Sequence, residues 1–71
     1  MKKKILVEGM SCMHCVGHVK EALSGLKGVT SAAVDLDSKT AVLESSVDVS
    51  DEDIKAAIDD AGYEAVKIEV L

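Results

Sequence analysis

Cys12 and Cys15 are the residues whose type and spacing point most directly to chemistry. They lie in the run Gly-Met-Ser-Cys-Met-His-Cys at residues 9–15, with two residues between them. Thiolates are soft ligands that select Cu(I), Zn(II) or iron–sulfur clusters. Zinc sites and clusters normally take four protein ligands, whereas the chain has only two cysteines. We therefore expect a two-thiolate site for Cu(I), an ion that two sulfur ligands can satisfy.

The histidines and methionines near this pair leave alternatives open. Zn(II) could recruit His14 or His18 with a carboxylate, although His14, on a helical turn, would face away from the ion that the cysteines share. We interpret both histidines as solvated surface residues, with a role for His14 in the pH dependence of metal release as the alternative. Met10 is expected to be buried beneath the loop, and Met13 to be an exposed contact for a partner.

The cellular compartment affects how the cysteine pair is interpreted. No apolar run is long enough for a signal peptide core or a membrane span, so we expect a soluble cytoplasmic protein. In a reducing compartment, paired cysteines more often bind metal or catalyse than form a structural disulfide. A thiol–disulfide oxidoreductase is the competing hypothesis, because it also uses Cys-x-x-Cys at a helix start. The chain contains no proline to face such a site, and we expect no enzymatic activity.

Length and charge narrow the function classes further. The 71 residues form one small domain, residues 1–71, with no room for an enclosed substrate cavity. The core must be aliphatic, because the sequence has no Phe or Trp and one Tyr. The net charge of −5 disfavours nucleic acid and anionic membranes as partners. Glu21 and the acidic run at residues 51–53 are interpreted as solvated surface, with steering of a basic protein partner as the alternative.

Apolar periodicity indicates six structural elements around the cysteine pair. Alternating polarity predicts four strands, at residues 3–8, 29–37, 40–44 and 63–70. Apolar spacings of three and four predict two helices, at residues 16–26 and 51–61. Ser50 resembles an N-cap and Gly62 a C-terminal cap, and Val66, Ile68 and Val70 are expected on one strand face. The βαββαβ order predicts an α+β ferredoxin-like sandwich, a four-stranded antiparallel sheet with both helices on one face.

The cysteines fall where the first loop becomes the first helix. Because residues three apart lie on the same face of a helix, both sulfurs would point to one place. Unpaired backbone N–H groups and the positive end of the helix dipole surround that place, and both lower the pKa of a thiol. We expect a site that is partly charged at neutral pH.

The run at residues 9–15, together with Gly62-Tyr63, resembles the heavy-metal-associated domain family over essentially the whole chain. That family has the ferredoxin-like fold, and it includes cytosolic copper chaperones of the CopZ type and the N-terminal domains of copper-exporting P-type ATPases. The resemblance implies that Cys12 and Cys15 are the metal ligands and that Tyr63 lies near the metal. From the residues alone, Tyr63 is equally an aromatic residue that packs in the core at a strand start.

The same resemblance implies a function. The chain is similar to a chaperone that passes Cu(I) by thiolate exchange to the metal-binding domain of a copper-transporting P-type ATPase, with a copper-responsive repressor as a further partner. Zinc and cadmium relatives often carry an acidic residue where Ser11 stands, which favours copper, and Met10 is implied to shape the loop. The alternatives are a domain of a larger ATPase, and a metal-bridged dimer of chains that are monomers without metal.

Overall fold

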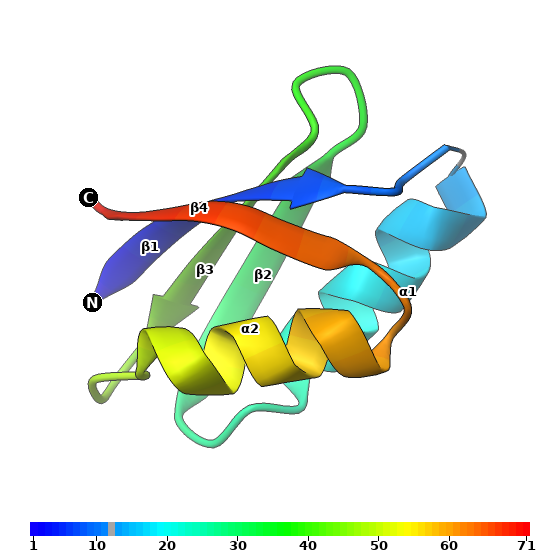
Figure 1. Ribbon diagram of the computed structural model, residues 1–71. Coiled ribbons are helices and arrows are strands. Elements are labelled where there is room, and N and C mark those ends of the chain that lie inside the picture. Colours follow the sequence, from blue (N-terminus) through cyan, green and yellow to red (C-terminus); the bar gives the residue numbers. More distant parts are fainter. Residues whose placement is uncertain (12) are drawn as a thin grey trace.

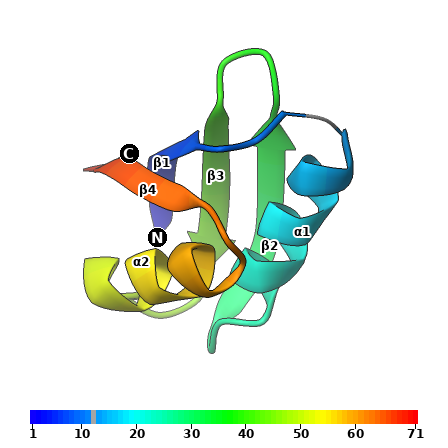
Figure 2. The same cartoon turned by 45° about the vertical axis from the view of Figure 1, so that its right-hand side comes forward.

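Four strands form one antiparallel sheet, and two helices cover one of its faces (Figures 1 and 2). The computed structural model describes residues 1–11 and 13–71. The strands are β1 (Lys2–Glu8), β2 (Val29–Asp35), β3 (Thr40–Ser45) and β4 (Glu64–Val70), and the helices are α1 (Met13–Ser24) and α2 (Asp51–Asp60). The strand order is β2-β3-β1-β4. This arrangement confirms the predicted ferredoxin-like fold.

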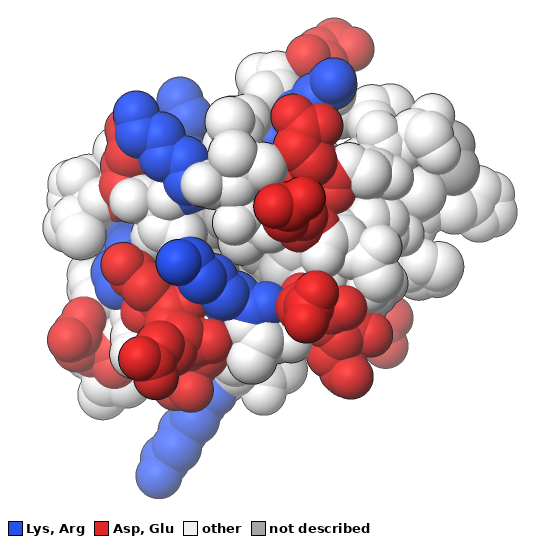
Figure 3. Space-filling view, in the orientation of Figure 1, with Lys and Arg blue, Asp and Glu red and all other residues white. Residues whose placement is uncertain are grey.

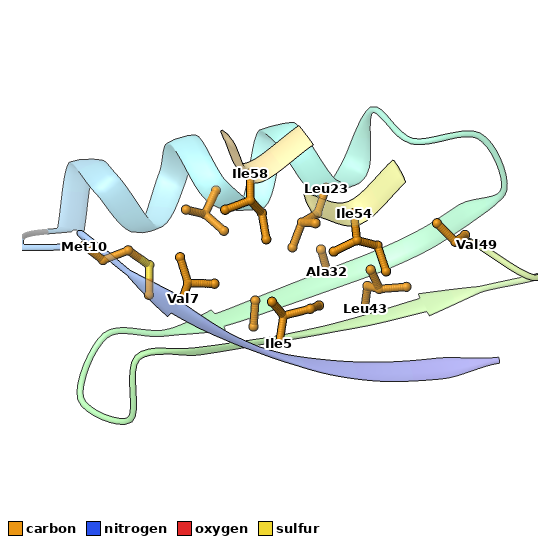
Figure 4. Packing of buried hydrophobic residues seen from close by; sticks show 11 residues of the cluster. Ile5, Val7, Met10, Leu23, Ala32, Leu43, Val49, Ile54 and Ile58 are labelled. Atoms are coloured by element: carbon orange, nitrogen blue, oxygen red, sulfur yellow. The ribbon is translucent and has the colours of Figure 1, made fainter. Parts of the chain in front are cut away.

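An aliphatic core fills the space between the sheet and the helices (Figure 4). Its fully buried large side chains come from β1, β3 and both helices: Ile5, Val7, Val19, Leu23, Leu43, Ile54 and Ile58. Each such side chain contributes about 1.5–3 kcal/mol through its removal from water. The apolar spacing of three and four in the helices matches the buried positions of α1 and α2. The apolar alternation in the strands matches the buried positions of β1 and β3.

Helix α2 has the two ends that its sequence predicts. The Ser50 side chain accepts a hydrogen bond from a backbone N–H of the first turn. At the other end Gly62 has a φ of 93°, and its N–H donates to the Asp59 carbonyl at 2.9 Å. The N–H of Tyr63 donates to the Ile58 carbonyl at 3.0 Å. These two bonds form a Schellman cap, which turns the chain into β4 and fixes the position of Tyr63.

The predicted apolar face of the last strand is right for Ile68 and Val70, which pair opposite the buried Ile5 and Lys3, and wrong for Val66. The pairing of β4 with β1 shifts register between Lys67 and Ala65, so that Val66 is an extra residue. Ala65 and Ile68 pack against the core, whereas the extra residue Val66 is 49% exposed. A one-residue slip moves every later side chain to the opposite face, and simple alternation cannot anticipate it.

Helix α1 also starts earlier than its apolar stripe predicts. The stripe begins at Val16, but the helix begins at Met13 and ends at Ser24. The first two residues of the helix, Met13 and His14, are exposed and therefore do not extend the apolar stripe. Cys15 therefore lies inside the first turn of α1. No described helix is long and apolar enough to cross a membrane.

Lys3 is a buried cation that the sequence did not reveal. It is 6% exposed, in line with the core side chains of β1. Its Nζ donates to the Val49 carbonyl at 2.6 Å and to Asp51 Oδ1 at 2.8 Å. These bonds satisfy a charge that would otherwise be costly to bury, and they tie β1 to the start of α2.

Candidate metal centre

Cys15 lies in the first turn of α1, next to the loop that leaves β1 (Figure 1). Its side chain is half-buried and packs partly against the core. The first N–H groups of a helix have no partner within the helix, and the dipole there favours negative charge. Cys12, the second predicted ligand, lies outside the described residues, so its role stays a prediction. The position of Cys15 suits a thiolate that reaches both solvent and an ion.

Ser11 lies close to the Cys15 sulfur. Its Oγ lies 3.9 Å from Cys15 Sγ, within hydrogen-bond reach for sulfur. When the hydroxyl donates, such a bond favours the charged form of the thiol. The resemblance named Ser11 only as the residue that replaces an acidic one, and the structure adds a direct contact with Cys15.

The two methionines of the segment take opposite positions. Met10 is 7% exposed and points into the core near Val7 (Figure 4), whereas Met13 is 70% exposed. These positions confirm that Met10 is buried and Met13 exposed. Burial leaves the Met10 thioether as an anchor for the loop, and exposure leaves Met13 free to touch another protein.

Tyr63 packs against Gly9, the first residue of the loop. Its position near the metal, which the resemblance implies, stays a prediction. Tyr63 is half-buried and packs against the core. A Cβ added at Gly9 would stand 3.3 Å from Tyr63 Cδ1, and Gly9 has a φ of 102°. The first residue of the loop thus needs to be glycine for two reasons, its conformation and the closeness of the ring.

Both histidines are exposed, which confirms their interpretation as surface residues. His18 nevertheless has a partner that sequence reasoning missed: its Nδ1 lies 3.4 Å from the hydroxyl of Tyr63. The two residues are 45 positions apart, and no local pattern connects them. Among residues 1–11 and 13–71, no three His, Cys, Asp or Glu side chains gather to hold a metal ion.

The segment around the site is uncharged. Residues 9–19 contain no Asp, Glu, Lys or Arg. In Figure 3 acidic side chains lie around α2 and β4 and at the loop between β2 and β3, whereas the end of this face where α1 begins is white. The predicted acidic run at residues 51–53 starts α2, and Asp51 pairs there with Lys3. The acidic run is therefore part of the helix start rather than of the metal centre.

Comparison with known proteins relates this geometry to a family. The model of the heavy-metal-associated domain matches residues 4–64. A protein of Staphylococcus haemolyticus named copper chaperone CopZ is 49% identical over 65 residues, which cover 90% of this chain and 96% of that protein.

Solved structures agree with the sequence comparison. A structure named CopZ metallochaperone superposes with a TM-score of 0.85 at 39% identity, covering 93% of this chain and all of that one. A copper-binding domain from a P-type ATPase superposes with a TM-score of 0.81 at 39% identity, covering 100% of this chain and 95% of that one. A carrier and a transporter domain thus share this fold.

Proposed function

Because the chain belongs to the heavy-metal-associated domain family, we propose that it is a cytoplasmic copper chaperone that binds one Cu(I) through Cys12 and Cys15. The observation that carries this proposal is the half-exposed Cys15 in the first turn of α1, three residues after Cys12 and beside the Ser11 hydroxyl. Two soft thiolates fit Cu(I), which does not require further ligands. The names of the similar proteins support copper as the cargo.

Exposure of the site favours transfer over storage. A thiolate of an acceptor protein adds to the bound Cu(I), which then has three sulfur ligands. One of the chain's own thiolates leaves, and a second exchange completes the transfer. Each exchange forms one Cu–S bond and breaks one. Copper stays Cu(I), so no oxidant or reductant is needed. The protein is a carrier in this scheme, and an insulin-reduction assay should show no turnover.

The metal-binding domain of a copper-transporting P-type ATPase is the proposed acceptor. Support comes from the copper-binding ATPase domain that shares the fold at 39% identity. An acceptor domain with a cysteine pair of its own would meet the requirement of a symmetric three-sulfur exchange. We also propose that residues 1–71 act as a single domain and that the metal-free chain is a monomer. A copper-responsive repressor is the second candidate acceptor.

A competition titration tests the binding site. With a bathocuproine-type chelator under anaerobic conditions, we expect one Cu(I) per chain, and the double variant Cys12→Ala with Cys15→Ala should lose that binding. Circular dichroism of the double variant checks that the fold survives. Native mass spectrometry with copper and zinc together measures the preferred metal and the oligomeric state. An unchanged affinity in the double variant contradicts the assignment of the ligands.

A further inference from the structure

Tyr63 connects three parts of the candidate metal centre. Its backbone N–H donates to the Ile58 carbonyl at 3.0 Å, which fixes the start of β4. Its ring lies against Gly9, where an added Cβ would be 3.3 Å from Cδ1. Its hydroxyl lies 3.4 Å from Nδ1 of His18. The side chain therefore reaches from the end of α2 to the loop and to α1.

His18 lies on α1 one turn beyond Cys15. Residues three apart share a face of a helix, so His18 stands on the same side as the sulfur. Gly9 begins the loop that leaves β1, and the first turn of α1 ends it. The contact between Tyr63 and His18 therefore links the two ends of the segment that includes Cys12 in the sequence.

We propose that His18 is a positioning residue for this site, holding the first turn of α1 in place relative to Gly9 through the hydroxyl of Tyr63. The inference rests on the proposed function, because the spacing of two thiolates matters only for an ion that both of them hold. A loop that is already ordered costs less free energy to fix on binding, and it retains the ion longer. Loss of the contact should therefore speed the release of Cu(I).

A direct ligand role for His18 makes a different prediction. If its ring bound the ion, removal of His18 would weaken binding, whereas removal of the Tyr63 hydroxyl would leave the ligand set complete. A positioning role instead makes both changes speed the release of Cu(I), because both break the contact between His18 and the Tyr63 hydroxyl. The comparison of the two single variants therefore separates the two roles.

Release kinetics provide the first test. The variants are His18→Ala, Tyr63→Phe and the two combined, with Ser24→Ala elsewhere on α1 as an exposed control. We expect an excess of bathocuproine-type chelator to remove Cu(I) about two- to fivefold faster from each single variant. The double variant should be faster by less than the product of the two single effects, because both changes break the shared contact. His18→Asn should restore the slow rate, because its amide stands near the position of Nδ1.

Tyr63 fluorescence provides a second test, which needs no metal. The chain has one Tyr and no Trp, so its emission reports on Tyr63 alone. In the metal-free protein, His18→Ala should change this emission and Ser24→Ala should not. A chain that failed to bind Cu(I) would still show this change, which separates the inference from the proposed function.

Three results would overturn the proposal. The first is an unchanged emission or an unchanged release rate in His18→Ala. The second is a double variant in which the two single effects multiply. The third is weaker Cu(I) binding in His18→Ala with wild-type binding in Tyr63→Phe, which is the pattern of a direct ligand.

Discussion

At the scale of single residues, the site depends on backbone conformation as much as on sulfur. Gly9 leads from β1 into the loop with a φ of 102°, and Tyr63 fills the space that a side chain there would occupy. The cysteine spacing could be found in the sequence because it is local. Two other contacts could not be found in the sequence: that of Gly9 with Tyr63, and that of Tyr63 with His18. These residues are far apart in the chain and meet only after folding.

Gly9→Ala should destabilise the protein by about 1–2 kcal/mol, since alanine adopts a positive φ at a cost and its Cβ would stand 3.3 Å from the Tyr63 ring. Urea unfolding followed by Tyr63 fluorescence measures the change. Gly17→Ala is the matched control, because Gly17 is helical and nothing lies within 4 Å of an added Cβ. Gly17→Ala should raise the free energy of unfolding by about 0.5–1 kcal/mol. Equal effects of the two substitutions would contradict the argument.

At the scale of elements, the sequence predicted those features that depend on residues close together in the chain. The ends of α2 were predicted within a residue, because Ser50 and Gly62 mark them. The start of α1 was missed because Met13 and His14 are exposed and add nothing to the apolar stripe. The bulge in β4 was missed because register depends on the partner strand. Burial of Lys3 was missed because its partners lie 46 and 48 residues away.

Lys3→Met should lower the free energy of unfolding by about 1–3 kcal/mol. Methionine keeps the apolar stem in place but removes the donor, leaving the Val49 carbonyl and Asp51 without the bonds of 2.6 and 2.8 Å. Urea denaturation gives the difference. Lys4→Met, at an exposed neighbouring position of β1, is the control and should change stability by less than about 0.5 kcal/mol. If both variants lost a similar free energy of unfolding, Lys3 would stabilise the protein only by its positive charge and not by its two hydrogen bonds.

At the scale of the whole molecule, charge and site are separated. The chain carries a net charge of −5, yet residues 9–19 carry no Asp, Glu, Lys or Arg. Both termini lie at the end of the molecule opposite the loop between β1 and α1 (Figure 1). An acceptor can therefore approach a segment with no charge of its own, bordered by the exposed and paired residues Glu8 and Glu64, while the acidic run at residues 51–53 lies at the start of α2.

The salt dependence of copper transfer should reflect this separation. The molecule measures 30 × 21 × 18 Å. The Debye length is about 30 Å at 10 mM salt and about 8 Å at 150 mM, so the whole net charge reaches an acceptor at the loop only in dilute salt. For a basic acceptor domain with its own Cys-x-x-Cys, stopped-flow kinetics should show a transfer rate that falls about tenfold between 10 and 150 mM and is then nearly constant.

Two other outcomes of the salt titration have distinct physical meanings. A rate that kept falling between 150 mM and 1 M salt would require charged pairs in direct contact, against the uncharged segment at residues 9–19. A rate that ignored salt throughout would mean that the acidic side chains around α2 are solvated surface with no part in steering. An acidic acceptor provides the control, because its transfer rate should rise with added salt as the repulsion from the net charge is screened.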